Sequence, residues 1–336
     1  ANWQDGVGGL DPYQEVSGVG NRVRFDDTSS GTSPIEITLE QTVTPRSITN
    51  DSTKDYTITG PGNIAGSTGV TKQGTGTLTL ETFNSFSGPI VLDGGTLRFG
   101  LLALGSGPIF FNGGELEWAS GNTEDISARA MIFNATAFLD TGGNEVFLAN
   151  AIGNGSPGGL VKTGAGRLAL LGGGTYTGNT VVEGGILTLG VELINSPAIV
   201  VQSGAVLDVV GLGEMNLNAG VSQVLAGTGS VDGTLNVGLG TSITPATNGV
   251  AGTLTILNSV GNGMLRMNGG TLFFDISTTE SDLVVVNGNL DLTAGTVQLI
   301  VGGPLANGTY KLIEYTGSIV GGSAANLVLA GFDQAG

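Results

Sequence analysis

A five-residue motif, in which a glycine is followed by alternating polar and apolar residues, returns along this chain at a nearly fixed interval. It occurs as GTLTL at 76–80, GTLRF at 95–99 and GELEW at 114–118, so successive copies start nineteen residues apart. Apolar residues fill its third and fifth positions, and polar residues fill the second and fourth. Alternation with period two is typical of a β-strand with one buried face. The motif therefore predicts strands separated by turns at a constant spacing.

The same motif continues over most of the chain. Later copies are GRLAL at 166–170, GILTL at 185–189, GTLNV from Gly233, GTLTI from Gly252, GTLFF from Gly270 and GNLDL from Gly288. A spacing of eighteen or nineteen residues matches one coil of a β-solenoid, whose strands stack in register about 4.8 Å apart. A β-sandwich predicts strands every 8–12 residues without a shared motif, and propeller blades need about 40 residues. We therefore expect an all-β, parallel β-solenoid with coils of about 18–20 residues.

Composition agrees with such a fold and excludes several classes of function. The 336 residues include 61 glycines, which turns at positive φ require, but no cysteine and no histidine. Disulfides, thiol catalysis and histidine-based triads or metal sites are therefore excluded. The net charge of −17 disfavours binding to nucleic acid and to anionic membrane surfaces. Since no stretch reaches about 18 uninterrupted apolar residues, we expect no membrane-spanning helix.

A longer repeat encloses the short motif. Residues 70–100 and 160–190 align without a gap, which places Lys72 on Lys162 and Gly74 on Gly164. The second copy, KTGAGRLALLGGGTYTGNTVVEGGILTLG, resembles the autotransporter-associated β-strand repeat, also called the passenger-associated transport repeat. The first copy matches it as well, with Phe86 in place of Tyr176. The resemblance implies a right-handed parallel β-helix that is extracellular or lies on a bacterial cell surface.

The motif spacing also suggests a division of the chain. Residues 1–35 lack the motif and are expected to form an entry segment or cap, with a possible inter-subunit strand. Residues 36–316 are expected to form the β-solenoid, and residues 317–336 a C-terminal edge segment. The segment 122–133 is the nearest candidate for a short helix or a lateral loop.

Carboxylates are the remaining candidates for catalysis, because some β-helices degrade polysaccharides and glycosidases use paired carboxylates. The candidate pairs are Asp26 with Asp27, Glu124 with Asp125, and Glu280 with Asp282. We interpret them as solvated loop charges, so no catalytic, cofactor-binding or metal-binding residue is predicted. The arginines that lie within motif strands, Arg98, Arg167 and Arg266, are expected to face outward.

The few aromatic residues fall into two groups. Those in or beside motif strands are expected to pack in the interior ladders: Phe99, Phe111, Trp118 and Phe274. Trp3, Tyr13 and Tyr176 are candidates for exposed aromatic residues, from which a sugar-binding platform could be built.

The sequence favours a non-enzymatic extracellular structural protein, such as a surface scaffold or a fibre subunit. Because the first and last coils of a solenoid have unpaired strand edges, we expect head-to-tail association with other copies of the chain. Cell surfaces or polysaccharides are further candidate partners. A passenger fragment of an adhesin is one alternative, and a polysaccharide-degrading β-helix is the other.

Overall fold

The computed structural model describes residues 15–16, 19–246, 251–261, 263–277, 280–303, 305 and 307–331. Within these residues β-strands dominate, and the helical elements are three short 3₁₀ turns: η1 (Val210–Leu212), η2 (Ala219–Val221) and η3 (Ala324–Asn326). The chain divides into two compact units, residues 1–167 and residues 168–336, which we describe in turn.

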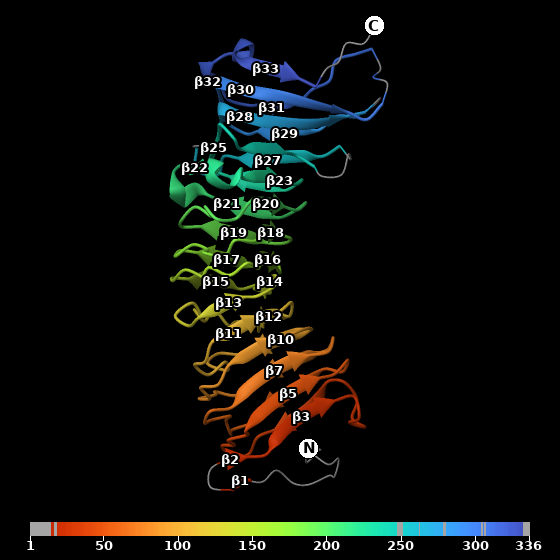
Figure 1. The fold of residues 1–336 in the computed structure, drawn as a ribbon, viewed down its shortest axis with the longest axis vertical. Helices are drawn as coiled ribbons and strands as arrows, with labels where there is room; N and C mark the ends of the chain where they lie inside the picture. Colours follow the sequence, from red (N-terminus) through yellow and green to blue (C-terminus); the bar gives the residue numbers. More distant parts are fainter. Residues whose placement is uncertain are drawn as a thin grey trace. The chain divides into compact units, whose positions relative to one another are not determined.

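In the first unit, strands from successive coils pair in parallel to form two sheets. One sheet has the order β13-β11-β9-β7-β5-β3, and the other includes β4-β6-β8-β10-β12-β14-β16. Figure 1 shows β3, β5 and β7 lying one above another. The strands of this unit are β1 (Glu15–Val16), β2 (Val19–Gly20), β3 (Arg22–Asp26), β4 (Ile35–Thr38), β5 (Ser47–Asp51), β6 (Tyr56–Thr59), β7 (Gly69–Gln73), β8 (Thr77–Leu80), β9 (Ile90–Leu92), β10 (Thr96–Phe99), β11 (Ile109–Phe111), β12 (Glu115–Trp118), β13 (Met131–Phe133), β14 (Ala137–Asp140), β15 (Glu145–Leu148) and β16 (Leu160–Thr163).

The repeated motif forms the interior ladder that its alternation predicts. Leu97 pairs in register with Leu78 on one side and with Leu116 on the other, and all three side chains are buried. Burying a leucine side chain contributes about 1.5–3 kcal/mol, so each coil adds a similar stabilising increment. At the end of the same strands, the ring of Phe99 packs on Trp118 with their centroids 5.1 Å apart. The expected core position of these aromatic residues is confirmed.

The second unit has the same architecture. One of its sheets includes β19-β21-β24-β27-β29-β31, and parallel pairing also runs through β18, β20, β23, β26, β28, β30 and β33. Its strands are β17 (Arg167–Leu170), β18 (Thr180–Val182), β19 (Ile186–Leu189), β20 (Ala198–Val201), β21 (Val206–Asp208), β22 (Met215–Asn216), β23 (Val224–Ala226), β24 (Ser230–Asp232), β25 (Thr234–Gly238), β26 (Ser242–Thr244), β27 (Thr253–Leu257), β28 (Met264–Ile276), β29 (Leu283–Val286), β30 (Asn289–Val301), β31 (Ile313–Tyr315), β32 (Ile319–Gly322) and β33 (Leu327–Ala330).

The two longest strands of this unit, β28 and β30, each contribute to two faces of a coil. Their pairing register shifts near Asn268, where the strands turn the corner between the two faces. Before this corner Leu265 pairs with Leu290, and after it Phe274 pairs with Leu299. All four side chains are buried, which also confirms the expected core position of Phe274.

The predicted all-β parallel β-solenoid is therefore confirmed in each unit. Parallel pairing already begins at β3, inside the segment 1–35, and β32 and β33 lie inside the segment 317–336. The division into a cap, a solenoid and an edge segment stays a prediction. Residues 122–133 form a lateral loop that ends in β13, and Trp118 Nε1 anchors this loop by donating a hydrogen bond to the Glu124 carbonyl at 3.0 Å.

Candidate functional site

Both candidate carboxylates of the first coil accept hydrogen bonds: Asp26 from its own turn, and Asp27 from the turn that follows β5 in the next coil. Asp26 accepts from the backbone N–H of Thr28 at 3.0 Å and from its hydroxyl at 2.5 Å. Asp27 accepts from the Ser52 hydroxyl at 2.5 Å and from the Thr53 N–H at 2.9 Å. The hydroxyl bonds, from Thr28 and Ser52 respectively, are the main cause that lowers the pKa of each carboxyl. Two ionised acceptors of this kind do not supply the general acid that glycoside hydrolysis requires.

Three of the other four candidate carboxylates also bind backbone groups. The fourth, Glu280, is exposed, and its backbone carbonyl accepts a hydrogen bond from Ser277 N at 2.8 Å. Glu124 accepts from the Leu102 N–H at 2.7 Å, and Asp125 accepts from the Ser127 N–H at 2.8 Å. Asp282 is buried and accepts from the N–H groups of Gly252 at 2.7 Å and Asp275 at 2.9 Å. Burial raises the pKa of Asp282. Glu124, Asp125 and Asp282 therefore stabilise loops by accepting hydrogen bonds from backbone N–H groups.

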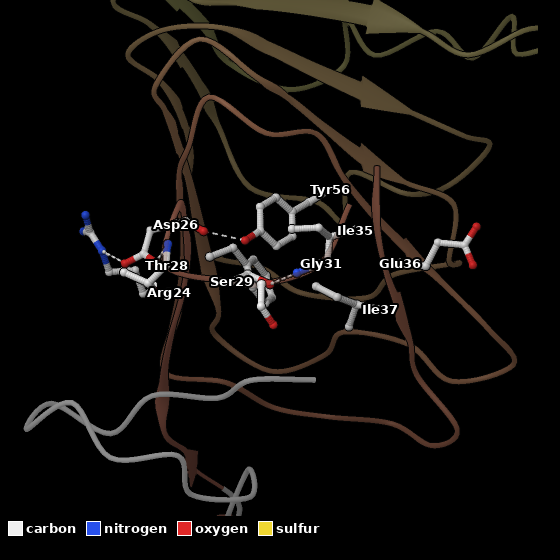
Figure 2. Close-up of a pocket in the computed structure, with 11 residues that line it drawn as sticks. Arg24, Asp26, Thr28, Ser29, Gly31, Ile35, Glu36, Ile37 and Tyr56 are labelled. Carbon is white, nitrogen blue, oxygen red and sulfur yellow. Dashed lines mark hydrogen bonds and ion pairs between the residues drawn. The ribbon is translucent and has the colours of Figure 1, made fainter. Parts of the chain in front are cut away.

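A pocket of about 200 Å³ lies in the first coil, and sequence reasoning did not identify it. Ile35, Ile37 and Tyr56 contribute its apolar surface, and Asp26, Thr28 and Ser29 its polar rim. Figure 2 shows the Tyr56 phenol directed at the backbone of Asp26, whose carbonyl accepts its hydrogen bond at 2.6 Å. In the same view the Glu36 carboxylate points away from the other side chains. The lining of the pocket is therefore mixed, with polar and apolar groups side by side.

A wider groove of about 570 Å³ lies in the second unit, with glycines 172–174 and Gly190 among its lining residues. Two further carboxylates line it, Glu192 and Glu214, neither of which was a candidate from the sequence. Glu192 accepts from Asn216 N at 2.8 Å, and Glu214 forms an ion pair with Arg266. Because both carboxylates have committed partners, the groove does not present a free catalytic pair.

The motif-strand arginines lie on the outward face, as predicted. Arg98 Nε lies 2.8 Å from Glu117 Oε1, and Arg266 Nε lies 3.1 Å from Asp291 Oδ2. Arg167 Nε is 4.0 Å from Glu145 Oε1. Among the residues that the structure describes, carboxylates do not gather in groups of three or more that could hold a metal ion.

The most unusual feature of the interior is a pair of buried lysines at the same position of the longer repeat. Lys162 Nζ donates to the carbonyl oxygens of Thr163 at 2.5 Å and Gly164 at 2.9 Å. Lys72 Nζ likewise donates to the carbonyls of Gln73 and Gly74. Each ammonium thus closes the turn that follows its own strand, and burial lowers the pKa of both lysines to about 8.

The turns that these lysines close depend on glycine. Gly74 and Gly164 have φ values of +65° and +74°, a region that other residues rarely adopt. A Cβ on Gly74 would lie 2.5 Å from backbone atoms of Ser52 in the preceding coil. The lysine and the glycine therefore act together in the repeat, because the carbonyls that the lysine binds belong to this tight turn.

Tyr176 corrects an expectation from the sequence, since it is buried and not an exposed aromatic residue. Its hydroxyl shares a hydrogen bond with Thr180 Oγ1 at 2.8 Å, and burial raises its pKa. Phe86, at the equivalent place in the first copy, is also buried. The position therefore supplies a large ring to the core, and the hydroxyl of Tyr176 is satisfied locally. Trp3 and Tyr13 lie outside the described residues.

The two segments that share this lysine, glycine turn and buried ring both match the family model of the passenger-associated transport repeat, over residues 70–99 and 160–189. The chain carries two passenger-associated transport repeats. This confirms the resemblance that the sequence suggested. In both repeats, the lysine, the glycine turn and the buried ring serve the packing and turn geometry of the coil.

A curated relative extends the similarity beyond the two passenger-associated transport repeats. The chain is 27% identical over 262 residues to the adhesin BmaC autotransporter of Brucella suis biovar 1 (strain 1330). The match covers 67% of this chain but only 7% of the relative, so the chain spans a small part of that protein's length. Within the described part of the chain, no helix is both long enough and apolar enough to cross a membrane.

Proposed function

We propose that the chain is a non-enzymatic section of a bacterial surface passenger, in which the β-solenoid is a structural scaffold for adhesion and associates end to end with other copies. The observation that carries the proposal is that five of the six candidate carboxylates serve as hydrogen-bond acceptors for turns and loops. Asp26, Asp27, Glu124, Asp125 and Asp282 all accept hydrogen bonds that hold turns or loops. The passenger-associated transport repeats and the adhesin relative support a location at the cell surface or outside the cell.

The outward faces supply what a scaffold needs. Arg98 and Glu117 form an ion pair on neighbouring coils, and Asn112 donates to Asp93 Oδ1 at 2.7 Å. These contacts link neighbouring coils through outward polar side chains. The apolar ladders pack in the interior. We infer that cell surfaces or polysaccharides would contact these polar faces.

An adhesion assay tests the scaffold function. Beads coated with the folded chain should be retained on polysaccharide-coated or cell-coated surfaces more than beads coated with the heat-unfolded chain. An unrelated acidic protein on the beads controls for charge alone. Equal retention of all three kinds of bead would contradict an adhesive role.

The polysaccharide-degrading alternative has its own test. The purified chain should release no new chain ends from pectin or alginate, with or without calcium. Reproducible cleavage that disappears in Asp26→Asn/Asp27→Asn or in Asp282→Asn, with the variants still folded by circular dichroism, would overturn the non-enzymatic proposal.

A further inference from the structure

Three consecutive coils of the first unit place an apolar side chain on the outside of one sheet. The strands β9, β11 and β13 have the sequences IVL, IFF and MIF, so their central residues are apolar as well as their two inward ones. These central residues, Val91, Phe110 and Ile132, pair in register, and each is half-buried. Alternation along a strand directs them away from the core. They form a continuous outward row along the stack of coils, which we call the apolar row.

A row of polar side chains runs beside the apolar row. Asp93, Asn112 and Asn134 each follow a member of the apolar row by two residues, and all three are exposed. Asn112 Nδ2 donates to Asp93 Oδ1 at 2.7 Å, and Asn134 Nδ2 donates to Asn112 Oδ1 at 2.9 Å. Gln73 Nε2 extends the row into the preceding coil by donating to Asp93 Oδ2 at 3.0 Å. These four side chains form a polar ladder whose members orient one another across the coils.

The two rows together offer what a sugar ring needs. A carboxylate accepts hydrogen bonds, and a side-chain amide has two N–H donors and an oxygen with two lone pairs. The bonds within the polar ladder use one N–H group each of Asn112 and Asn134, which leaves further donors and lone pairs for hydroxyl groups. The face of an aromatic ring such as Phe110 is negative and attracts the C–H groups of a sugar ring.

The period of the two rows selects among chain-like ligands. Neighbouring coils lie about 4.7–4.9 Å apart, so both rows repeat at this distance. An extended peptide presents side chains to one face only every second residue, or about every 6.6 Å, and it would lose register within a few coils. One ring of an extended glycan is about as long as one coil step. The rows therefore match a glycan that lies along the stack of coils.

Charge selects a neutral glycan. The carboxylate of Asp93 lies within the polar ladder, and the whole chain carries a net charge of −17, so an acidic polysaccharide would be repelled. The same charge opposes the packing of a second copy of the chain on this face. A neutral glycan avoids the repulsion, and its hydroxyl groups can donate charge-assisted hydrogen bonds to Asp93.

We propose that this face of the first unit binds a neutral, β-1,4-linked glycan. Such a chain is a flat ribbon, with C–H groups on its ring faces and hydroxyl groups along its edges. The ring faces pack on the apolar row, with Phe110 at its centre, and the hydroxyl groups of one edge bind the polar ladder. This inference rests on the proposed function in adhesion, and it names the class of ligand and the face that takes it.

Isothermal titration calorimetry of the full chain tests the proposal with three neutral hexasaccharides, cellohexaose, xylohexaose and N-acetylchitohexaose. At least one of them should bind, whereas hexamannuronate, which has the same linkage and length but is acidic, should not. Phe110→Ser removes the aromatic surface and should weaken binding about tenfold. Asn112→Ala interrupts the polar ladder and should weaken binding about threefold or more. Phe138→Ser is the matched control, because Phe138 is also outward and half-buried but lies on β14 of the other sheet.

Several results would overturn the assignment. These are a lack of binding by all three neutral hexasaccharides, equal binding of hexamannuronate, and equal losses in Phe110→Ser and Phe138→Ser. Dimers in sedimentation that Phe110→Ser abolishes, without hexasaccharide binding, would assign the face to a second copy instead. Circular dichroism melts verify folding, and Phe110→Leu is the milder substitute. Coated beads that are retained on cells although no hexasaccharide binds would reject this face and leave the adhesive function standing.

Discussion

The ammonium group of Lys72 lies directly against Gly95 in the next coil, and a Cβ built on Gly95 would stand 2.6 Å from Lys72 Nζ. The same Cβ would lie 2.5 Å from the carbonyl oxygen of Gly74. Gly95 therefore packs against both the buried ammonium of Lys72 and the Gly74 turn that this ammonium stabilises. The spacing between the lysine and the Gly-Gly pair in the repeat follows from this contact between neighbouring coils.

Substitution of this glycine should therefore be costly. Gly95 has φ +59°, so Gly95→Ala combines backbone strain with contact against Lys72, and we expect a loss of about 2 kcal/mol or more in the free energy of unfolding. Gly94→Ala is the matched control, because its Cβ would approach other atoms only to 3.4 Å. It should stay within about 1 kcal/mol of the wild type. Urea denaturation measures both, and equal effects would contradict the assigned contact.

The interior ladder predicts a second strong effect. Leu97→Asp buries a carboxylate between Leu78 and Leu116, and we expect a loss of at least about 3 kcal/mol. Thr96→Asn changes the outward neighbour on the same strand and should cost less than about 1 kcal/mol. Thermal melts followed by circular dichroism compare the two. Wild-type stability in Leu97→Asp would mean that the register is wrong.

The buried lysines predict an unusual pH dependence. Burial lowers the pKa of Lys72 and Lys162 to about 8, whereas the unfolded chain keeps the ordinary value of 10.5. Between these values the unfolded state binds more protons, so the free energy of unfolding rises with pH. From pH 7.5 to 9.5 the gain should be about 2 kcal/mol per lysine. The raised pKa of Tyr176 lowers stability only above about pH 10, outside this range.

Lysine variants isolate this dependence. Lys72→Met should remove about half of the rise in stability from pH 7.5 to 9.5, and Lys72→Met/Lys162→Met should remove most of it. Urea denaturation at both pH values measures the difference for each variant. An unchanged rise in the double variant would mean that other groups titrate.

Sequence patterns predicted the ladders well and the polar interior poorly. The ladder of Leu78, Leu97 and Leu116 was predictable from two patterns. The period of two determines which residues of a strand point inward, and the nineteen-residue interval determines which residues of neighbouring coils pair. The burial of Tyr176 was not predictable from its turn-like surroundings, although Phe86 at the equivalent place was a usable signal. Lys72 follows Val70 by two residues, so the alternation places it inward, whereas the general rarity of buried lysine points the other way. The sequence therefore provided no clear indication of its burial. The first-coil pocket could not be predicted from the sequence, because its lining residues come from three separate strands.

Salt should strengthen the proposed association of copies. The chain carries a net charge of −17, so two copies of it repel each other. Raising the ionic strength shortens the Debye length from about 10 Å at 0.1 M to about 3 Å at 1 M, which weakens the repulsion between copies. Sedimentation at these two salt concentrations should therefore give a larger mean mass in 1 M salt. A smaller mean mass at high salt would point instead to ion pairs at the contact.

The pairing of Ile90 with Ile109 and of Leu97 with Leu116 has a consequence for how such a chain can change over generations. Residues 90–108 make up one whole coil, so their deletion would bring Ile109 to the place of Ile90 with every ladder still in register. Duplication of the same segment would lengthen the stack by one step. A gene of this kind can gain or lose nineteen codons at once and still encode the same fold, whereas a slip of a single residue would turn inward leucines toward water.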